Sequence, residues 1–195
     1  MLNIAHGISG AFDYVWMKWP TIFLGVFVRR CIYKMKLGLC GSKVRFGDNV
    51  HINGFHNISI GSNTNFMTGS FLYANDGGLI TIGKRGSFNH NIHFGGAGGV
   101  LTIGDNVLIG PNVVLRVSDH TFEDSGTLIM DQGHSGGKIT IGNDVWLAAN
   151  VVVTSGVTIG NGVVVGAGSV VTEDLPEMSV CVGAPAKPIK KRTSY

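Results

Sequence analysis

The chain has 195 residues, of which 30 are glycine and 14% are charged, and its formal net charge is +3. This length fits one domain with a substantial core. Basic residues gather near the two ends and the stretch between them is mainly acidic, which excludes a nucleic-acid groove, so we expect no nucleic-acid partner.

The N-terminal part, residues 1–43, is rich in aromatic and basic side chains. A helix is expected from Thr21 to Leu37, because Pro20 suits its first turn and Gly38 follows its end. One interpretation is a helical cap that shields the open end of the repeats that follow.

A compatible interpretation places residues 11–40 on an anionic membrane surface, as a peripheral contact. Aromatic side chains would anchor in the interface, and basic side chains would face the headgroups. The anchors are Trp16, Trp19 and Phe23, and the basic residues are Arg29, Arg30, Lys34 and Lys36. The most apolar window, Trp19–Val28, has about ten residues, whereas a spanning helix needs about 20.

Residues 44–175 carry a six-residue repeat, in which aliphatic residues are often followed by a small one. The clearest run is Ile141, Leu147, Val153, Ile159, Val165 and Val171. Neither a helix, with a period of 3.6, nor a lone strand, with a period of 2, produces this spacing. Stacked short strands do, because three hexads close one triangular coil. The sequence therefore predicts an all-β fold, a parallel β-helix.

The repeat spacing is interrupted at three places. Asn75–Gly78 and Gly95–Gly99 are interpreted as small corner insertions, and residues 116–138 form a long loop. A long excursion from a rigid stack is a typical place for function. After Thr172 the pattern ends, and residues 176–195 are expected to form a C-terminal turn and a basic tail.

The long loop contains a histidine among carboxylates, in Ser118–Asp124. An acid can fix the tautomer of an imidazole and raise its basicity, as a general base requires. Asp119 or Glu123 could orient His120 in this way. Loop histidines and acids are also often only solvated, and spacing alone leaves both interpretations open.

Five segments together resemble the hexapeptide-repeat acyltransferases, most closely the galactoside, maltose and xenobiotic acetyltransferase branch. They are Ile103–Leu115, Asp119-His120, Ile139–Gly160, Val164–Thr172 and Gly183–Lys187. The resemblance covers roughly residues 44–192. The basic, aromatic N-terminal helix is similar to that of enzymes that acetylate bacterial surface polysaccharides.

The resemblance implies a left-handed β-helix in a homotrimer, with acetyl-CoA between neighbouring prisms. It places His120 at the family's catalytic position. The family's substrate-contacting asparagine falls on Asn89, with Asn91 as a weaker candidate, and Asp119 and Glu123 complete the candidate substrate-binding set.

For acetyl-CoA, the resemblance implies five contacts, at Ala149, Ala167, Thr172, Lys187 and Lys190. The chain departs from the family at Glu173, where a lysine is common, and a carboxylate cannot bind phosphate as a cation. Trp146 matches the family's Val-Trp signature and is interpreted as structural.

The function expected from the resemblance is acetyl-CoA-dependent O-acetylation of a sugar hydroxyl, in a cell-surface polysaccharide or its precursor. Cys31, Cys40 and Cys181 lack metal-ligand spacing and no cleavable signal is evident, so we expect a cytoplasmic enzyme without a metal, which could lie at the inner face of the membrane. The acceptor sugar, its carrier and any role of His134 stay undetermined.

Three alternatives remain. N-acetylation of an amino-sugar nucleotide uses the same prism, but no glycine-fingerprint βαβ unit precedes it here. A zinc-dependent prism would need clustered histidines, yet His90 and His93, three residues apart, would point to opposite faces of a strand. A noncatalytic scaffold would not explain why Asp119-His120 stands in the long loop.

Overall fold

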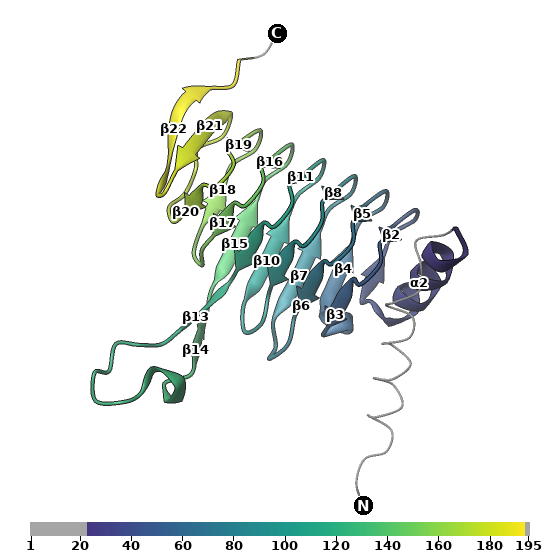
Figure 1. The fold of residues 1–195 in the computed structure, drawn as a ribbon, viewed down its shortest axis with the longest axis horizontal. Coiled ribbons are helices and arrows are strands. Elements are labelled where there is room, and N and C mark those ends of the chain that lie inside the picture. The colour runs from purple at the N-terminus through teal and green to yellow at the C-terminus, as the bar shows by residue number, and fades with distance from the viewer. Residues whose placement is uncertain (1–22, 194–195) are drawn as a thin grey trace, which may run out of the picture.

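The structure is a computed structural model that describes residues 23–193. Residues 1–22 and 194–195 lie outside this part, and so do the expected anchors Trp16 and Trp19 and the first two residues of the expected helix. Three parallel sheets form the sides of a prism whose coils are stacked along one axis (Figure 1).

Each sheet takes one strand from every coil, so its strands are far apart in sequence but adjacent in space. Sheet A contains β1 (Leu39–Cys40), β4 (Ile58–Ile60), β7 (Leu79–Ile82), β10 (Val100–Ile103), β15 (Lys138–Ile141) and β18 (Thr158–Ile159). Sheet B contains β2 (Arg45–Phe46), β5 (Asn65–Phe66), β8 (Ser87–Phe88), β11 (Leu108–Ile109), β16 (Trp146–Leu147), β19 (Val164–Val165), β21 (Ser179–Gly183) and β22 (Ala186–Lys191). Sheet C contains β3 (His51–Asn53), β6 (Phe71–Tyr73), β9 (His93–Gly95), β12 (Val114–Arg116), β17 (Val152–Val153) and β20 (Val170–Val171).

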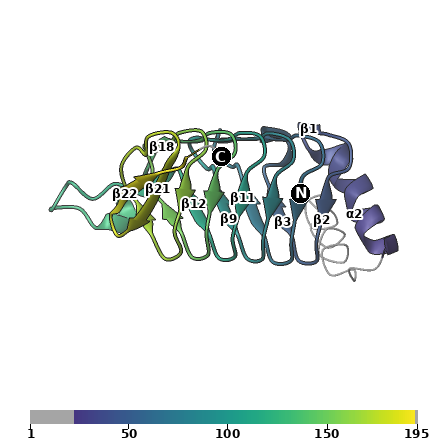
Figure 2. The same cartoon turned by 90° about the horizontal axis from the view of Figure 1, so that it is seen from above.

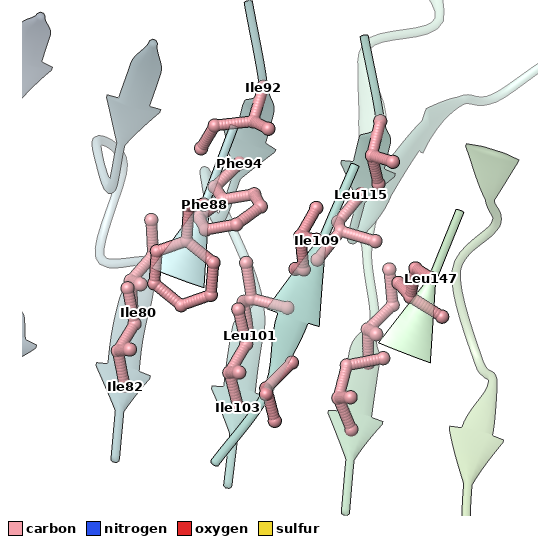
Figure 3. Close-up of a cluster of buried hydrophobic side chains, with 14 of the residues drawn as sticks. Ile80, Ile82, Phe88, Ile92, Phe94, Leu101, Ile103, Ile109, Leu115 and Leu147 are labelled. Atoms are coloured by element: carbon pink, nitrogen blue, oxygen red, sulfur yellow. The ribbon is translucent and has the colours of Figure 1, made fainter. Parts of the chain in front are cut away.

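The six-residue repeat positions the core, because a typical repeat sends two apolar side chains into the prism, as Val145 and Leu147 show. Equivalent positions stack in register: Leu101 lies beside Ile80 (Figure 3), and on its other side it pairs with Ile139. Phe88 is fully buried with its ring centroid 5.0 Å from that of Phe66. The predicted parallel β-helix is therefore confirmed as a β-solenoid whose interior is a continuous apolar column.

Helix α2 (Phe23–Lys36) lies across the first coil (Figures 1 and 2). Arg29 is fully buried there, donates from Nε to the carbonyl of Phe46 at 3.1 Å and forms an ion pair with Asp48 at 2.9 Å. The Tyr33 hydroxyl donates to the carbonyl of Val50 at 2.9 Å. Arg29 thus binds the first coil and does not face outward, so its expected place among the headgroup-facing cations is wrong.

No helix among residues 23–193 is long and apolar enough to cross a membrane. A short 3₁₀ turn, η1 (Phe55–Asn57), supports the helix, with the Phe55 ring 5.4 Å from that of Tyr33.

The C-terminal segment differs from the expected turn and tail, because β21 and β22 form an antiparallel hairpin. Val180 and Cys181 continue the parallel register of Val164 and Val165 on sheet B. The hairpin then covers the edge that a bare last coil would expose. Arg192 closes the end by an ion pair with Asp144 at 2.8 Å.

The long loop also has structure. β13 (Ser118–His120) and β14 (His134–Gly136) pair antiparallel, and η2 (Ile129–Asp131) lies near the tip. We call residues 118–136 the arm. It leaves the corner between sheets C and A and projects from the prism (Figure 1).

Candidate active site

The root of the arm is held tightly by backbone contacts. Gly137 donates its N–H to the carbonyl of Val117 at 2.6 Å, and the Ser155 hydroxyl donates to the same carbonyl at 2.8 Å. A Cβ added to Gly136 would lie 2.6 Å from the carbonyl carbon of Gly98, in the corner insertion Gly95–Gly99. The corner insertion Gly95–Gly99 therefore packs against the root of the arm, and we call it the seat of the arm. Gly136 permits this close approach of the two backbones because it has no Cβ.

The outer part of the arm folds on itself. Asp124 accepts hydrogen bonds from the Thr127 hydroxyl at 2.7 Å and from the N–H of Gly126 at 2.8 Å. Both hydrogen bonds lower the pKa of the Asp124 carboxyl, and the bond from Thr127 has the larger effect. Gln132 donates to the carbonyls of Asp124 and Thr127, both at 2.8 Å, so the tip is a closed turn.

His120 is exposed at the end of β13 and lies opposite His134 on β14. Their ring centroids are 4.0 Å apart, with an interplanar angle of 38°. Among residues 23–193, no hydrogen bond or ion pair joins His120 to Asp119 or Glu123. Asp119 precedes His120 on the strand, so the two side chains leave on opposite faces. Glu123 instead accepts from the N–H of Phe122 at 3.1 Å.

His134 is thus the ring partner of His120, and the repeat pattern predicted no role for it. The signal was present: Ser118-Asp119-His120 and His134-Ser135-Gly136 are the two ends of one excursion. Their antiparallel register, which brings the two rings into contact, is not encoded in the six-residue repeat.

Four of the expected ligand-binding residues share one corner of the prism, where the chain passes from sheet B to sheet C. We call it the B–C corner. In order along the prism axis these residues are Asn89, Asn91, Ala149 and Ala167. The N–H of Gly168 donates to the carbonyl of Ala149 at 2.9 Å, which stacks the two alanine-bearing turns directly.

The two asparagines differ in what they can still bind. Asn91 has a left-handed backbone (φ 56°), and its amide donates to Asn112, which donates to Asn150, in a ladder along the corner. The Asn89 side-chain oxygen accepts from the N–H of His90 at 2.8 Å. In the described part of the chain the NH₂ group of Asn89 has no partner, so it can donate to a ligand.

At the C-terminal end, Thr172 and Glu173 follow β20 and are exposed. Glu173 forms an ion pair with Lys187 at 2.6 Å. Glu173, which stands where the family commonly has lysine, therefore neutralises Lys187, one of the two cations expected to bind phosphate. Lys190 is exposed on β22 and makes no ion pair within residues 23–193.

A cluster on sheet C had no expected role. The His93 ring lies 5.1 Å from Tyr73 and 5.9 Å from Phe71, and the Arg116 guanidinium lies over Tyr73 at 5.7 Å. Burial lowers the pKa of His93, and the nearby charge of Arg116 lowers it further. Residues 23–193 contain no group of three or more His, Cys, Asp or Glu that could hold a metal ion.

One chain does not bring all of these residues together. The candidate ligand residues lie along the B–C corner, whereas His120 belongs to an arm rooted between sheets C and A that extends away from the prism (Figure 1).

Comparisons with known proteins agree with this architecture. Residues 138–173 match the family model described as bacterial transferase hexapeptide (six repeats), and residues 100–118 match the hexapeptide repeat of succinyl-transferase. The galactoside O-acetyltransferase of Escherichia coli K12 is 42% identical over 120 residues, which are 62% of this chain and 58% of that protein. The chain spans little more than half the length of the curated relatives that it matches.

Two solved structures cover more of the chain. The maltose O-acetyltransferase of Clostridium difficile 630 is 27% identical with a TM-score of 0.62, and the match covers 93% of this chain and 82% of that one. A hexapeptide-repeat acetyltransferase of Vibrio cholerae, complexed with acetyl-coenzyme A, is 26% identical with a TM-score of 0.62 and coverages of 92% and 83%. Residues 100–118 and 138–173 thus carry hexapeptide repeats, and the chain is similar in sequence and fold to acetyltransferases that contain them.

Proposed function

We propose that the protein is an acetyl-CoA-dependent O-acetyltransferase that acetylates a sugar hydroxyl of a cell-surface polysaccharide or its precursor. The observation that carries the proposal is the exposed His120 on a structured arm, in a chain similar to galactoside and maltose O-acetyltransferases. The polysaccharide acceptor is supported only by the basic, aromatic N-terminal segment. Reduced cysteines support a cytoplasmic location.

His120 is the general base of this proposal. It accepts the proton of the sugar hydroxyl while the oxygen attacks the thioester carbonyl of acetyl-CoA. Its partner His134 holds the ring on the arm. The tetrahedral oxyanion then collapses to the acetylated sugar, and the CoA thiolate leaves and takes a proton.

Asn89 is the candidate donor to the oxyanion or to the sugar, because its NH₂ group is free in the described part of the chain. Acetyl-CoA would lie along the B–C corner, past Ala149 and Ala167 and toward Thr172. Lys187 and Lys190 would pair with its phosphates. Asn91, Asp119 and Glu123 are further candidates for contacts with the acceptor.

The proposal requires a homotrimer, in which each arm reaches the B–C corner of a neighbour. The arm supports this through its apolar tip: the exposed fractions of Phe122, Leu128, Ile129 and Met130 lie between 57% and 78%. Clustered apolar side chains of this kind mark a surface that is covered by another one.

The N-terminal segment could also hold the enzyme on the membrane. Lys34 is exposed on helix α2, whereas Arg29 is buried and Arg30 is half-buried. Binding to anionic vesicles should weaken with salt, because this attraction is screened over about 10 Å at 0.1 M. Sedimentation with anionic and neutral vesicles at two salt concentrations tests it, and equal binding to both would refute it.

The direct test of the function is incubation of the full chain with acetyl-CoA and a panel of sugars. We expect release of the CoA thiol together with a sugar ester, which alkaline hydroxylamine cleaves. An amide product from an amino sugar would instead show N-acetylation, and thiol release without any acetylated sugar would contradict acetyl transfer to a glycan.

A further inference from the structure

A groove of about 980 Å³ lies between helix α2 and the first two coils of sheet B. Residues 43–47 and 63–68 form its floor, Phe27 and Arg30 of the helix form one wall, and His90 lies at its far end. The groove does not include the expected acetyl-CoA contacts, which lie on later coils and on the C-terminal hairpin. The proposed transfer step does not involve it.

The groove is positively charged. Arg30, Lys43 and Arg45 line it, and no carboxylate does. None of the three cations forms an ion pair with another residue between 23 and 193. Asp48, the nearest acid in sequence, already pairs with Arg29. Three uncompensated cations around one concavity favour a multiply charged anion, and a diphosphate matches them best.

The groove also leads to the proposed site of transfer. Its end residue His90 follows Asn89 directly. Arg45 pairs in register with Asn65, and Asn65 with Ser87, on the outer side of sheet B. Two strand spacings separate Arg45 from Ser87, about 10 Å. That is roughly the reach of a sugar ring and the phosphates attached to it.

We propose that this groove binds the diphosphate of a carrier-linked sugar and so directs the attached sugar to Asn89 and His120. The proposal rests on the proposed function and names its acceptor class, a sugar diphosphate rather than a free sugar. Phe27, whose side chain is 54% exposed at the wall, would contact the carrier beyond the diphosphate. The carrier can be a nucleoside or a polyprenyl chain, which share the diphosphate.

The test is calorimetric titration of the full chain, first saturated with CoA so that the cofactor's own phosphate contacts are filled. Three probes are used: inorganic pyrophosphate, uridine diphosphate and farnesyl diphosphate. We expect each to bind, and Lys43→Gln or Arg45→Gln to weaken binding about tenfold, the loss of one charge-assisted hydrogen bond. Tighter binding of uridine diphosphate or of farnesyl diphosphate would identify the carrier.

Arg85→Gln is the matched control. Arg85 is an exposed cation on the same corner as Lys43, has a similar backbone (φ 61° against 55°) and does not line the groove. Absence of saturable binding, or an equal loss in Arg85→Gln, would overturn the proposal. CoA binding is measured in the same titrations, so a chain that binds diphosphates but not CoA would refute the proposed function and leave the groove assignment standing.

Discussion

The seat of the arm determines where His120 is held, and Gly136→Ala perturbs it directly. The added Cβ would lie 2.6 Å from the carbonyl carbon of Gly98, whereas ordinary contacts begin near 3.4 Å. The carbonyl oxygen of Gly98 lies closer still, and because it is backbone the arm or the corner insertion must move by more than about 1 Å. Misplacement by about 1 Å can cost on the order of a hundredfold in rate.

We therefore expect Gly136→Ala to lower kcat about a hundredfold in a thiol-release assay. The CoA dissociation constant should stay near that of the wild type, because the B–C corner is untouched. The urea midpoint should change little, since the arm lies outside the core. The control is Gly133→Asn, where a left-handed backbone (φ 78°) suits asparagine and no atom lies within 4 Å. Wild-type turnover in Gly136→Ala would refute the claim that the arm must be placed accurately.

Three further outcomes are expected. His120→Ala should lower turnover by about 10²–10⁴, the contribution of a general base, with CoA affinity unchanged in a titration. Glu173→Gln should release Lys187 from its ion pair and lower the KM for acetyl-CoA about two- to fivefold; an unchanged KM would remove Lys187 from phosphate binding. His93 has a pKa lowered by burial, so the unfolded chain binds more protons and stability falls as pH drops through about 6.5. His93→Gln should make the urea midpoint less dependent on pH between 8 and 5.

The six-residue repeat was enough to predict the prism. Its aliphatic positions, such as Ile141 and Val153, are fully or almost fully buried, and the corner insertions fall where the coil spacing lengthens. Because one coil has 18 residues, Ala149 and Ala167 were also predicted to lie on the same corner. These features depend only on local period, which a sequence displays directly.

The features that were missed depend on pairings between segments without a common period. The hairpin β21–β22, the ring contact of His120 with His134, and the ion pair of Glu173 with Lys187 are of this kind. Arg29 was expected on the surface because a lone arginine gives no sign of a buried carbonyl partner. The proposed meeting of His120 with Asn89 of another copy follows from the resemblance to the family, because no period within one chain indicates it.

Complementation between two inactive variants tests the shared site most directly. Alone, His120→Ala and Asn89→Ala should each transfer acetyl groups at no more than a small fraction of the wild-type rate. In trimers co-assembled from equal amounts of both, an intact arm from one variant meets an intact corner from the other at about one quarter of the interfaces. We predict that thiol release with the acceptor sugar recovers to about that fraction of the wild-type rate. No recovery in proven mixed trimers would show that His120 and Asn89 act within one chain, and would contradict the account.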